Sequence, residues 1–327
     1  MTAFSRRAFL GAALCAGALP LQARAAAYPG GRPVRLVVPY TPGGGTDTVA
    51  RAIAAKITAS TGWTIVVENR PGAGGNIGMD AVAESEPDGH MLGLGQTSNL
   101  AINPALMPRM PFDAAKDFAP VALVASLPVV LVVKADAPWQ TLGALIEDAQ
   151  ARPGAIKQAL AGSGTVGHLA GELLAHQARF EVLNVPYRGA APALNDLLGG
   201  STDYMFATPQ ASQEMLKGKV LRPLAVTART RLSILPDVPT VAESGYDGFE
   251  ALDWKALVAP AGTPPQVIAA VNRVMEKILA DPATVAMFTA EGSTAMGGSP
   301  EAARQYIEDE QKKWARLIRA ARIQTAA

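Results

Sequence analysis

Three glycines followed by a threonine form the stretch with the clearest chemical potential. Residues 34–38 are aliphatic or β-branched and predict a buried strand, and Gly43, Gly44 and Gly45 follow after a proline-containing turn. Residues without a Cβ can turn sharply with their N–H groups exposed. Thr46 is a suitable N-cap for a helix whose apolar residues recur on one face. Because free N–H groups at a helix N-terminus bind anions, the stretch predicts a carboxylate or phosphate site, the alternative being an ordinary strand–helix connection.

Asp47 lies in the first turn of that expected helix, where its charge suits the helix dipole. An uncompensated carboxylate 4 Å from an anionic ligand would repel it by about 1 to 4 kcal/mol, depending on the dielectric. We therefore expect Asp47 either to point away from a ligand and cap backbone N–H groups, or to recognise an ammonium group on the ligand.

A second glycine-rich turn, residues 162–167, lies between an expected strand and an expected helix at 168–178. It has the spacing of a dinucleotide-binding fingerprint, but the next strand ends without the acidic residue that would hold the ribose. Ser163 and His168 lack the spacing of a hydrolase nucleophile elbow, and the three histidines of the chain have no metal-ligand spacing. We therefore expect no cofactor, metal or catalytic residue, and the same turn suits a carboxylate.

Two further groups of polar side chains could contact a ligand. Thr97, Ser98 and Asn99 directly follow an expected strand at 90–95, and ligands gather at such strand ends in open parallel sheets. Arg188 could bind a carboxylate through two parallel hydrogen bonds, the alternative being an ordinary surface arginine.

Strand and helix patterns alternate along the chain, which is typical of an α/β fold. A strand at 252–259 could return to the first α/β unit, and helices capped by Thr263 and Ser299 follow. Two crossings between the units, near 132–134 and 249–254, predict a hinged two-lobed protein with a cleft between the lobes.

The first residues form an export signal. Residues 5–10 are a twin-arginine pattern, and the apolar stretch that follows is too short to span a membrane. Residues 1–27 therefore predict export to the periplasm by the twin-arginine route. The only cysteine, Cys15, lies within this signal, so the mature protein is expected to lack disulfides and thiol chemistry.

Composition restricts the class of partner. The chain has 327 residues, of which 49% are apolar, enough for two cores. The formal net charge is only +1, and loss of three arginines with the signal lowers it further, which argues against nucleic acid binding.

Several motifs together resemble the Bug family, the periplasmic solute receptors of tripartite tricarboxylate transporters. The most specific is the run Glu-Asn-Arg-Pro-Gly-Ala-Gly-Gly-Asn at 68–76. The remaining matches, in family order along the whole mature chain, are residues 42–47, 87–89, 162–165, 168–172 and 185–189.

This resemblance implies a type II periplasmic-binding-protein fold with two α/β lobes around a central cleft. Lobe 1 would comprise residues 28–131 plus 251–327, and lobe 2 residues 132–250. The protein would be a monomeric receptor and not an enzyme. It would present a small carboxylate (a di- or tricarboxylate, an acidic amino acid or an aromatic acid) to membrane transporter subunits. The alternatives are a hydrolase on the same scaffold and a sensor that feeds a signalling system.

The resemblance also implies which residues line the cleft. Family members hold carboxylates largely through backbone N–H groups, small hydroxyls and ordered water. The implied ligand-binding residues of the first lobe are Tyr40, Gly43, Gly44, Gly45, Thr46, Asp47, Thr97, Ser98 and Asn99. Those of the second lobe are Ser163, Gly164, Thr165, His168, Arg188, Gly189 and Ala190.

Overall fold

The computed structural model describes residues 28–323 and contains two β-sheets, each covered by helices. Residues 1–27, which carry the predicted export signal, and residues 324–327 lie outside the described residues. None of the described helices is long and apolar enough to cross a membrane.

The larger sheet has six strands and belongs to what we call lobe 1. Its strands, in spatial order, are β11 (Thr294–Gly297), β4 (Phe118–Pro128), β10 (Leu252–Pro260), β3 (Met91–Gln96), β1 (Val34–Val38) and β2 (Ile65–Asn69). Its helices are α2 (Gly45–Thr61), α3 (Asn76–Ala83), α4 (Asn103–Leu106), α9 (Pro265–Ala280), α10 (Pro282–Ala290) and α11 (Pro300–Ala320), with the short turns η1 (Ala73–Gly75) and η2 (Ser98–Ile102).

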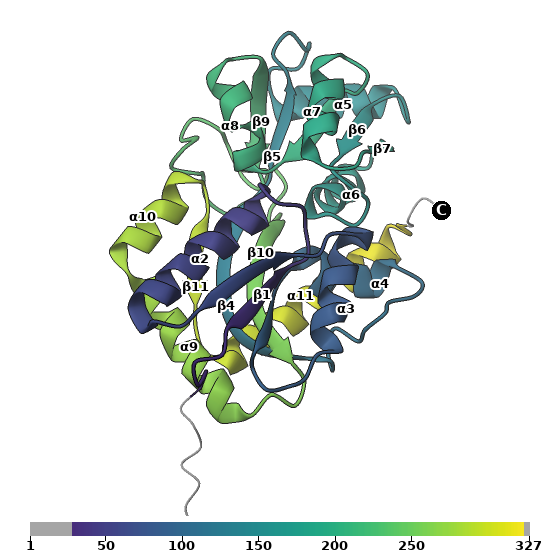
Figure 1. Ribbon diagram of the computed structural model, residues 1–327. Coiled ribbons are helices and arrows are strands. Elements are labelled where there is room, and N and C mark those ends of the chain that lie inside the picture. The colour runs from purple at the N-terminus through teal and green to yellow at the C-terminus, as the bar shows by residue number, and fades with distance from the viewer. Residues whose placement is uncertain (1–27, 324–327) are drawn as a thin grey trace, which may run out of the picture.

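The smaller sheet has five strands and belongs to lobe 2. Its strands, in spatial order, are β7 (Leu183–Pro186), β6 (Lys157–Leu160), β8 (Tyr204–Ala207), β5 (Val130–Lys134) and β9 (Leu221–Val226). Its helices are α5 (Leu142–Ala151), α6 (Val166–Ala178), α7 (Ala190–Leu198) and α8 (Pro209–Lys217). Figure 1 shows the two lobes as separate groups of elements joined at β4–β5 and β9–β10.

The expected strand–helix alternation is confirmed. Strand β4 ends at Pro128, where the sequence predicts a break, and β10 returns to the first sheet by pairing with β3 and β4. The first crossing lies earlier than the expected 132–134, because β5 belongs entirely to the five-stranded sheet and only Val129 separates it from β4. The sequence did not predict η2, α4, α10 or β11.

Two predicted helix caps are wrong. Helix α2 begins at Gly45 with Gly44 as its N-cap, and the Thr46 hydroxyl donates instead to Gln96 Oε1 at 2.6 Å. Helix α9 has Pro264 as its N-cap, because the Thr263 hydroxyl donates back to the Pro260 carbonyl oxygen at 2.8 Å.

A further boundary also differs from the prediction. Helix α6 begins at Val166, before the expected start at residue 168, because the Thr165 hydroxyl caps it by accepting from the backbone N–H of His168 at 3.4 Å.

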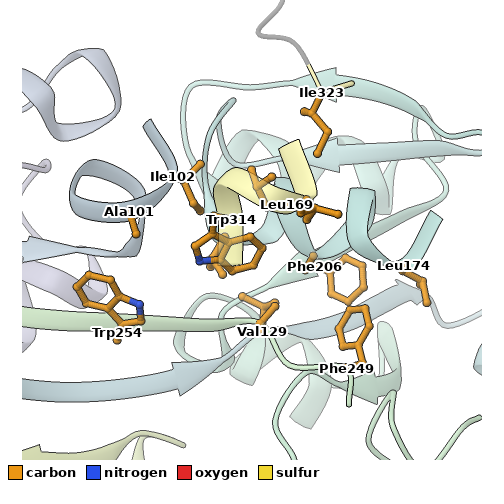
Figure 2. Packing of buried hydrophobic residues seen from close by; sticks show 14 of the residues in the cluster. Ala101, Ile102, Val129, Leu169, Leu174, Phe206, Phe249, Trp254, Trp314 and Ile323 are labelled. Carbon is orange, nitrogen blue, oxygen red and sulfur yellow. The ribbon is translucent and has the colours of Figure 1, made fainter. Parts of the chain in front are cut away.

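Both lobes contribute to one buried cluster at the crossings. Figure 2 shows Val129 and Phe249 of the connecting segments near Phe206 of lobe 2 and Trp314 of lobe 1. The indole N–H groups of Trp254 and Trp314 both donate to Glu310 Oε2, at 2.9 and 3.0 Å. This shared packing fixes the two connecting segments against side chains of both lobes.

Thr227 joins the two crossing segments. Its fully buried hydroxyl accepts from the Val129 N–H at 2.9 Å and donates to the Ala251 carbonyl oxygen at 2.6 Å. The Thr227 N–H also donates to the Val129 carbonyl oxygen at 3.0 Å. One side chain therefore holds the chain entering lobe 2 beside the chain leaving it.

Replacing Thr227 by valine is expected to lower the free energy of unfolding by about 1 to 3 kcal/mol, because buried backbone groups lose their partner. Urea titration of the two proteins measures this loss. Thr289→Val is the control, since that exposed hydroxyl bonds only within its own helix and should change stability by less than about 0.5 kcal/mol. Equal losses in the two variants would contradict the role given to Thr227.

Candidate ligand-binding site

Asp47 is buried in the first turn of α2, and both of its carboxylate oxygens have partners. Oδ2 accepts from the Gly43 N–H and from Arg51 Nε, each at 2.9 Å, and Oδ1 accepts from Asn69 Nδ2 at 2.9 Å. The bond from Arg51, supported by those from Gly43 and Asn69, lowers the pKa of Asp47 to about 2. This is the arrangement expected from the capping alternative for Asp47.

The lowered pKa of Asp47 gives a pH-dependent prediction. Its contribution to stability is complete above the unfolded-state pKa of about 4 and is lost as the pH falls toward 2. Asp47→Asn should therefore lower the free energy of unfolding by about 1 to 3 kcal/mol at pH 7. The difference from the native protein should shrink below pH 4 in urea titrations at several pH values. Asp309→Asn, an exposed pair partner of Lys312, is the control, and a pH-independent loss in Asp47→Asn would contradict the explanation.

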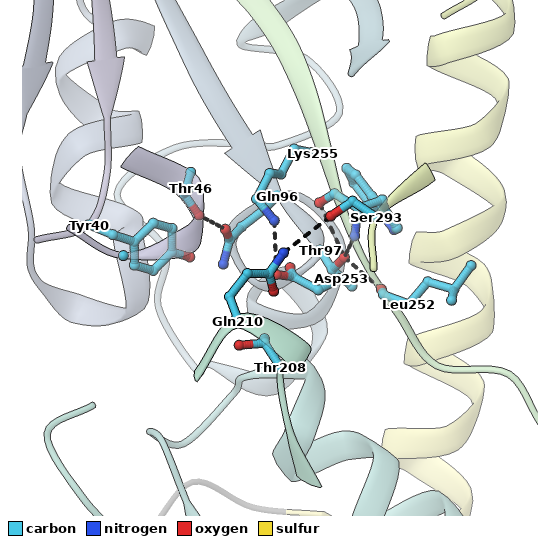
Figure 3. Close-up of polar contacts among 12 residues, drawn as sticks. Tyr40, Thr46, Gln96, Thr97, Thr208, Gln210, Leu252, Asp253, Lys255 and Ser293 are labelled. Carbon is cyan, nitrogen blue, oxygen red and sulfur yellow. Dashed lines mark hydrogen bonds and ion pairs between the residues drawn. The ribbon is translucent and has the colours of Figure 1, made fainter. Parts of the chain in front are cut away.

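The central part of the site lies where β3 ends beside β10. Gln96 and Lys255 are cross-strand partners, so their side chains share a face, and Thr46 binds Gln96 from the start of α2. Strand alternation puts Asp253 on the face of Lys255 and Trp254 on the opposite one. Lys255 is only 1% exposed, and its Nζ lies 3.1 Å from Asp253 Oδ2. Figure 3 shows this group of polar side chains.

Tyr40 closes one side of this group. Its hydroxyl donates to the Gly74 carbonyl oxygen at 3.1 Å and accepts from Asn99 Nδ2 at 3.2 Å. Burial, followed by the negative charge of Asp253, raises the pKa of Tyr40, so its hydroxyl is neutral at pH 7. Tyr40 and Asn99, both implied by the sequence, thus lie together in lobe 1.

Lobe 2 reaches the same place through the start of α8. Gln210 Nε2 donates to Ser293 Oγ of lobe 1 at 3.2 Å, and Thr208 caps the helix. In Figure 3, Gln210 extends toward Asp253, and Thr208 lies below Gln210 at the start of the same helix. The site is therefore built from both lobes.

Three buried oxygens at the junction of the lobes have no hydrogen-bond partner among the described residues. They are Asp253 Oδ1, Gln210 Oε1 and Asn103 Oδ1. A buried acceptor left unpaired costs about 1 to 3 kcal/mol, so native proteins rarely keep one without a ligand or water to satisfy it. Each of these atoms can accept a further hydrogen bond.

The Gly162–Thr165 turn also contacts lobe 1. A Cβ on Gly164 would lie 2.6 Å from Asn103 Oδ1, and Gly164 has a φ of +75°. The Gly164 N–H donates to His168 Nδ1 at 3.2 Å. Burial lowers the pKa of His168 to about 4, so the neutral ring is an acceptor at pH 7 and supports the turn from within lobe 2.

The other residues that the sequence implied differ in burial and in the element on which they lie. Thr97 is fully buried, and its hydroxyl bonds the β10 backbone by accepting from the Trp254 N–H at 2.9 Å. Ser98 begins η2, and Thr165 caps α6. Arg188 is exposed and pairs with no acidic group among residues 28–323. Contact with a ligand stays a prediction for every residue that the sequence implied: Tyr40, Gly43, Gly44, Gly45, Thr46, Asp47, Thr97, Ser98, Asn99, Ser163, Gly164, Thr165, His168, Arg188, Gly189 and Ala190.

The sequence analysis missed Asp253 and Lys255. The pattern Leu-Asp-Trp-Lys-Ala-Leu-Val-Ala-Pro contains the information, because two opposite charges two residues apart in an apolar strand must share a buried face. Gln96, Gln210 and Ser293 carry no such local pattern. Among the described residues, no group of three or more His, Cys, Asp or Glu side chains could hold a metal ion.

Comparison with known proteins identifies the family. A sequence profile described as "Tripartite tricarboxylate transporter family receptor" matches residues 49–323. This chain belongs to that receptor family. The receptor is 40% identical to Protein BugT of Bordetella pertussis over 293 residues, which cover 89% of this chain and 90% of BugT.

Two solved structures resemble the receptor closely. R. palustris Rpa4515 with adipate has a TM-score of 0.84 and 34% identity, covering 90% of this chain and 98% of that one. MatC from Rhodopseudomonas palustris with bound malate has a TM-score of 0.79 and 32% identity, covering 88% and 99%. The receptor has the expected type II periplasmic-binding-protein fold, and as a member of this family it is a solute-binding receptor.

Proposed function

We propose that this receptor captures its carboxylate ligand between the lobes with Lys255 as the charge partner, and delivers it unchanged to membrane subunits of a tripartite tricarboxylate transporter. The observation that carries the proposal is a lysine that is 1% exposed at the junction of the two lobes. Buried ammonium groups are costly unless a charge or ligand compensates them. Asp253 supplies one partner, and the lysine has further N–H donors for a ligand carboxylate.

The other ligand contacts come from loops of both lobes. The backbone N–H groups of Gly44 and Gly45 lie at the N-terminus of α2, where they favour a negative group. The turn with Gly164 and Thr165 contributes from lobe 2, where Gly164 lies against Asn103 of lobe 1. The oxygens of Asp47 are already occupied within the chain, which supports a structural role for this residue.

Closure of the lobes completes the site. Gln210 and Ser293 bond across the junction, and Thr227 joins the connecting segments. A transporter would distinguish the closed, loaded receptor from the open one by this change. The protein acts in the periplasm as a monomer, after export by the twin-arginine route. Uptake is favoured over catalysis or signalling because the family consists of transporter receptors.

A thermal-shift screen of the mature protein against small carboxylic acids tests this function. At about 100 times its dissociation constant, a ligand adds roughly 2.7 kcal/mol and raises the melting temperature by several degrees. We expect one chemical series to do so, while the matching amides do not. Absence of any shift, with no acid released from denatured protein in mass spectrometry, would overturn the proposal. Conversion of the bound acid would favour an enzyme.

A further inference from the structure

We propose that Asp253 recognises a protonated amine on the ligand, so that the receptor binds an amino acid through paired charges. This inference rests on the proposed function, which assigns the ligand carboxylate to Lys255. Asp253 is 8% exposed and uses only Oδ2 for Lys255, whereas Oδ1 is buried without a partner among the described residues. The two side chains lie on one face of β10, two residues apart, as Figure 3 shows.

The charge balance of the site favours a ligand without net charge. Lys255 and Asp253 are opposite charges in contact. Tyr40 is a neutral phenol at pH 7, and Gln96, Thr46, Gln210 and Ser293 carry no charge. Asp47 is compensated by Arg51. A zwitterion would set its carboxylate against Lys255 and its ammonium against Asp253, whereas the second carboxylate of a dianion would face the negative charge of Asp253.

The unpaired acceptors favour an amine over other groups. Asp253 Oδ1 and Gln210 Oε1 come from facing lobes, and both lack a donor among residues 28–323. A protonated amine carries three N–H donors and can satisfy both oxygens, whereas a hydroxyl has one and a carboxylate none. Because Gln210 arrives only when the lobes meet at Ser293, an amine would also stabilise the closed state.

Calorimetric titration of the native receptor with matched acids tests this inference. Each set has the same skeleton with an amine, a hydroxyl or a hydrogen at the second carbon, for example glutamate, 2-hydroxyglutarate and glutarate. Further pairs are 2-aminoadipate with adipate, alanine with propionate, and phenylalanine with phenylpropionate. We expect one skeleton to bind, with its amino member at least tenfold tighter than the other members.

Asp253→Asn separates recognition of the amine from positioning of Lys255. It should weaken binding of the amino member at least tenfold more than it weakens binding of the amine-free member. Asp281→Asn is the matched control, because Asp281 pairs with Lys56 at the same 3.1 Å within lobe 1 and should change neither.

The outcomes distinguish failure of amine recognition by Asp253 from failure of the proposed receptor function. Amine-free or hydroxy acids that bind the native receptor as tightly as the amino acid would overturn the inference and leave the proposed function intact. An equal loss for all ligands in Asp253→Asn would also overturn it. Binding of no acid of any kind would contradict the proposed function itself. The titration of the native receptor with matched acids tests the inference even if Asp253→Asn does not fold.

Discussion

Lys255→Met is expected to weaken ligand binding by roughly 30- to 1,000-fold, the largest effect of any single substitution in this receptor. Lys255 is 1% exposed, so its bond to a ligand carboxylate forms away from water. Removing one partner of a buried, hydrogen-bonded charge pair costs about 2 to 4 kcal/mol, which corresponds to that loss of affinity. Methionine keeps the length and apolar contacts of the lysine stem while removing the charge.

Two further variants make the lysine result interpretable. Lys56→Met removes a lysine that pairs with Asp281 at the same 3.1 Å but in a partly exposed position, and should bind ligand as the native receptor does. Lys255→Met leaves Asp253 unpaired, so Lys255→Met/Asp253→Asn should recover stability without recovering affinity. Calorimetric titration measures affinity, and urea titration measures stability. Binding within threefold of native in Lys255→Met would remove this lysine from the site.

Gly164→Ala is expected to weaken binding at least tenfold by opposing lobe closure. The new Cβ would lie 2.6 Å from Asn103 Oδ1 on the other lobe, closer than a Cβ can approach without movement. The φ of +75° adds strain of about 1 to 2 kcal/mol within lobe 2. Because apparent affinity falls with the population of the closed form, hindered closure weakens every ligand by a similar factor.

Gly200→Ala separates closure from backbone strain. Gly200 has a φ of +78°, but its Cβ would meet nothing within 4 Å. Both variants should lose similar stability, whereas only Gly164→Ala should lose affinity. Small-angle scattering with saturating ligand should show an incompletely closed form in Gly164→Ala alone. Equal affinities in the two variants would show that the contact between Gly164 and Asn103 does not govern closure.

The sequence alone determined the α/β class and the two-lobed topology. Alternating apolar periods predict strands and helices locally, and Pro128 interrupts a long apolar run where β4 ends. The sequence also predicted a strand after the second α/β unit that could return to the first, and β10 does pair with β3. These features depend on short-range periodicity, which a single chain displays directly. Matches of the glycine-rich motifs added the family, which the comparisons confirmed.

Only the tertiary structure brought the centre of the site together. Gln96, Gln210 and Lys255 come from β3, α8 and β10, and no local pattern relates residues so far apart. Thr46 was expected to cap a helix, but the helix begins one residue before it, and tertiary folding places the Thr46 hydroxyl where it donates to Gln96 of β3. The unpaired oxygen of Asp253 likewise exists only because packing of both lobes removes it from water. Helix and strand periods follow from neighbours in the sequence, whereas burial and pairing of charges depend on which distant surfaces meet.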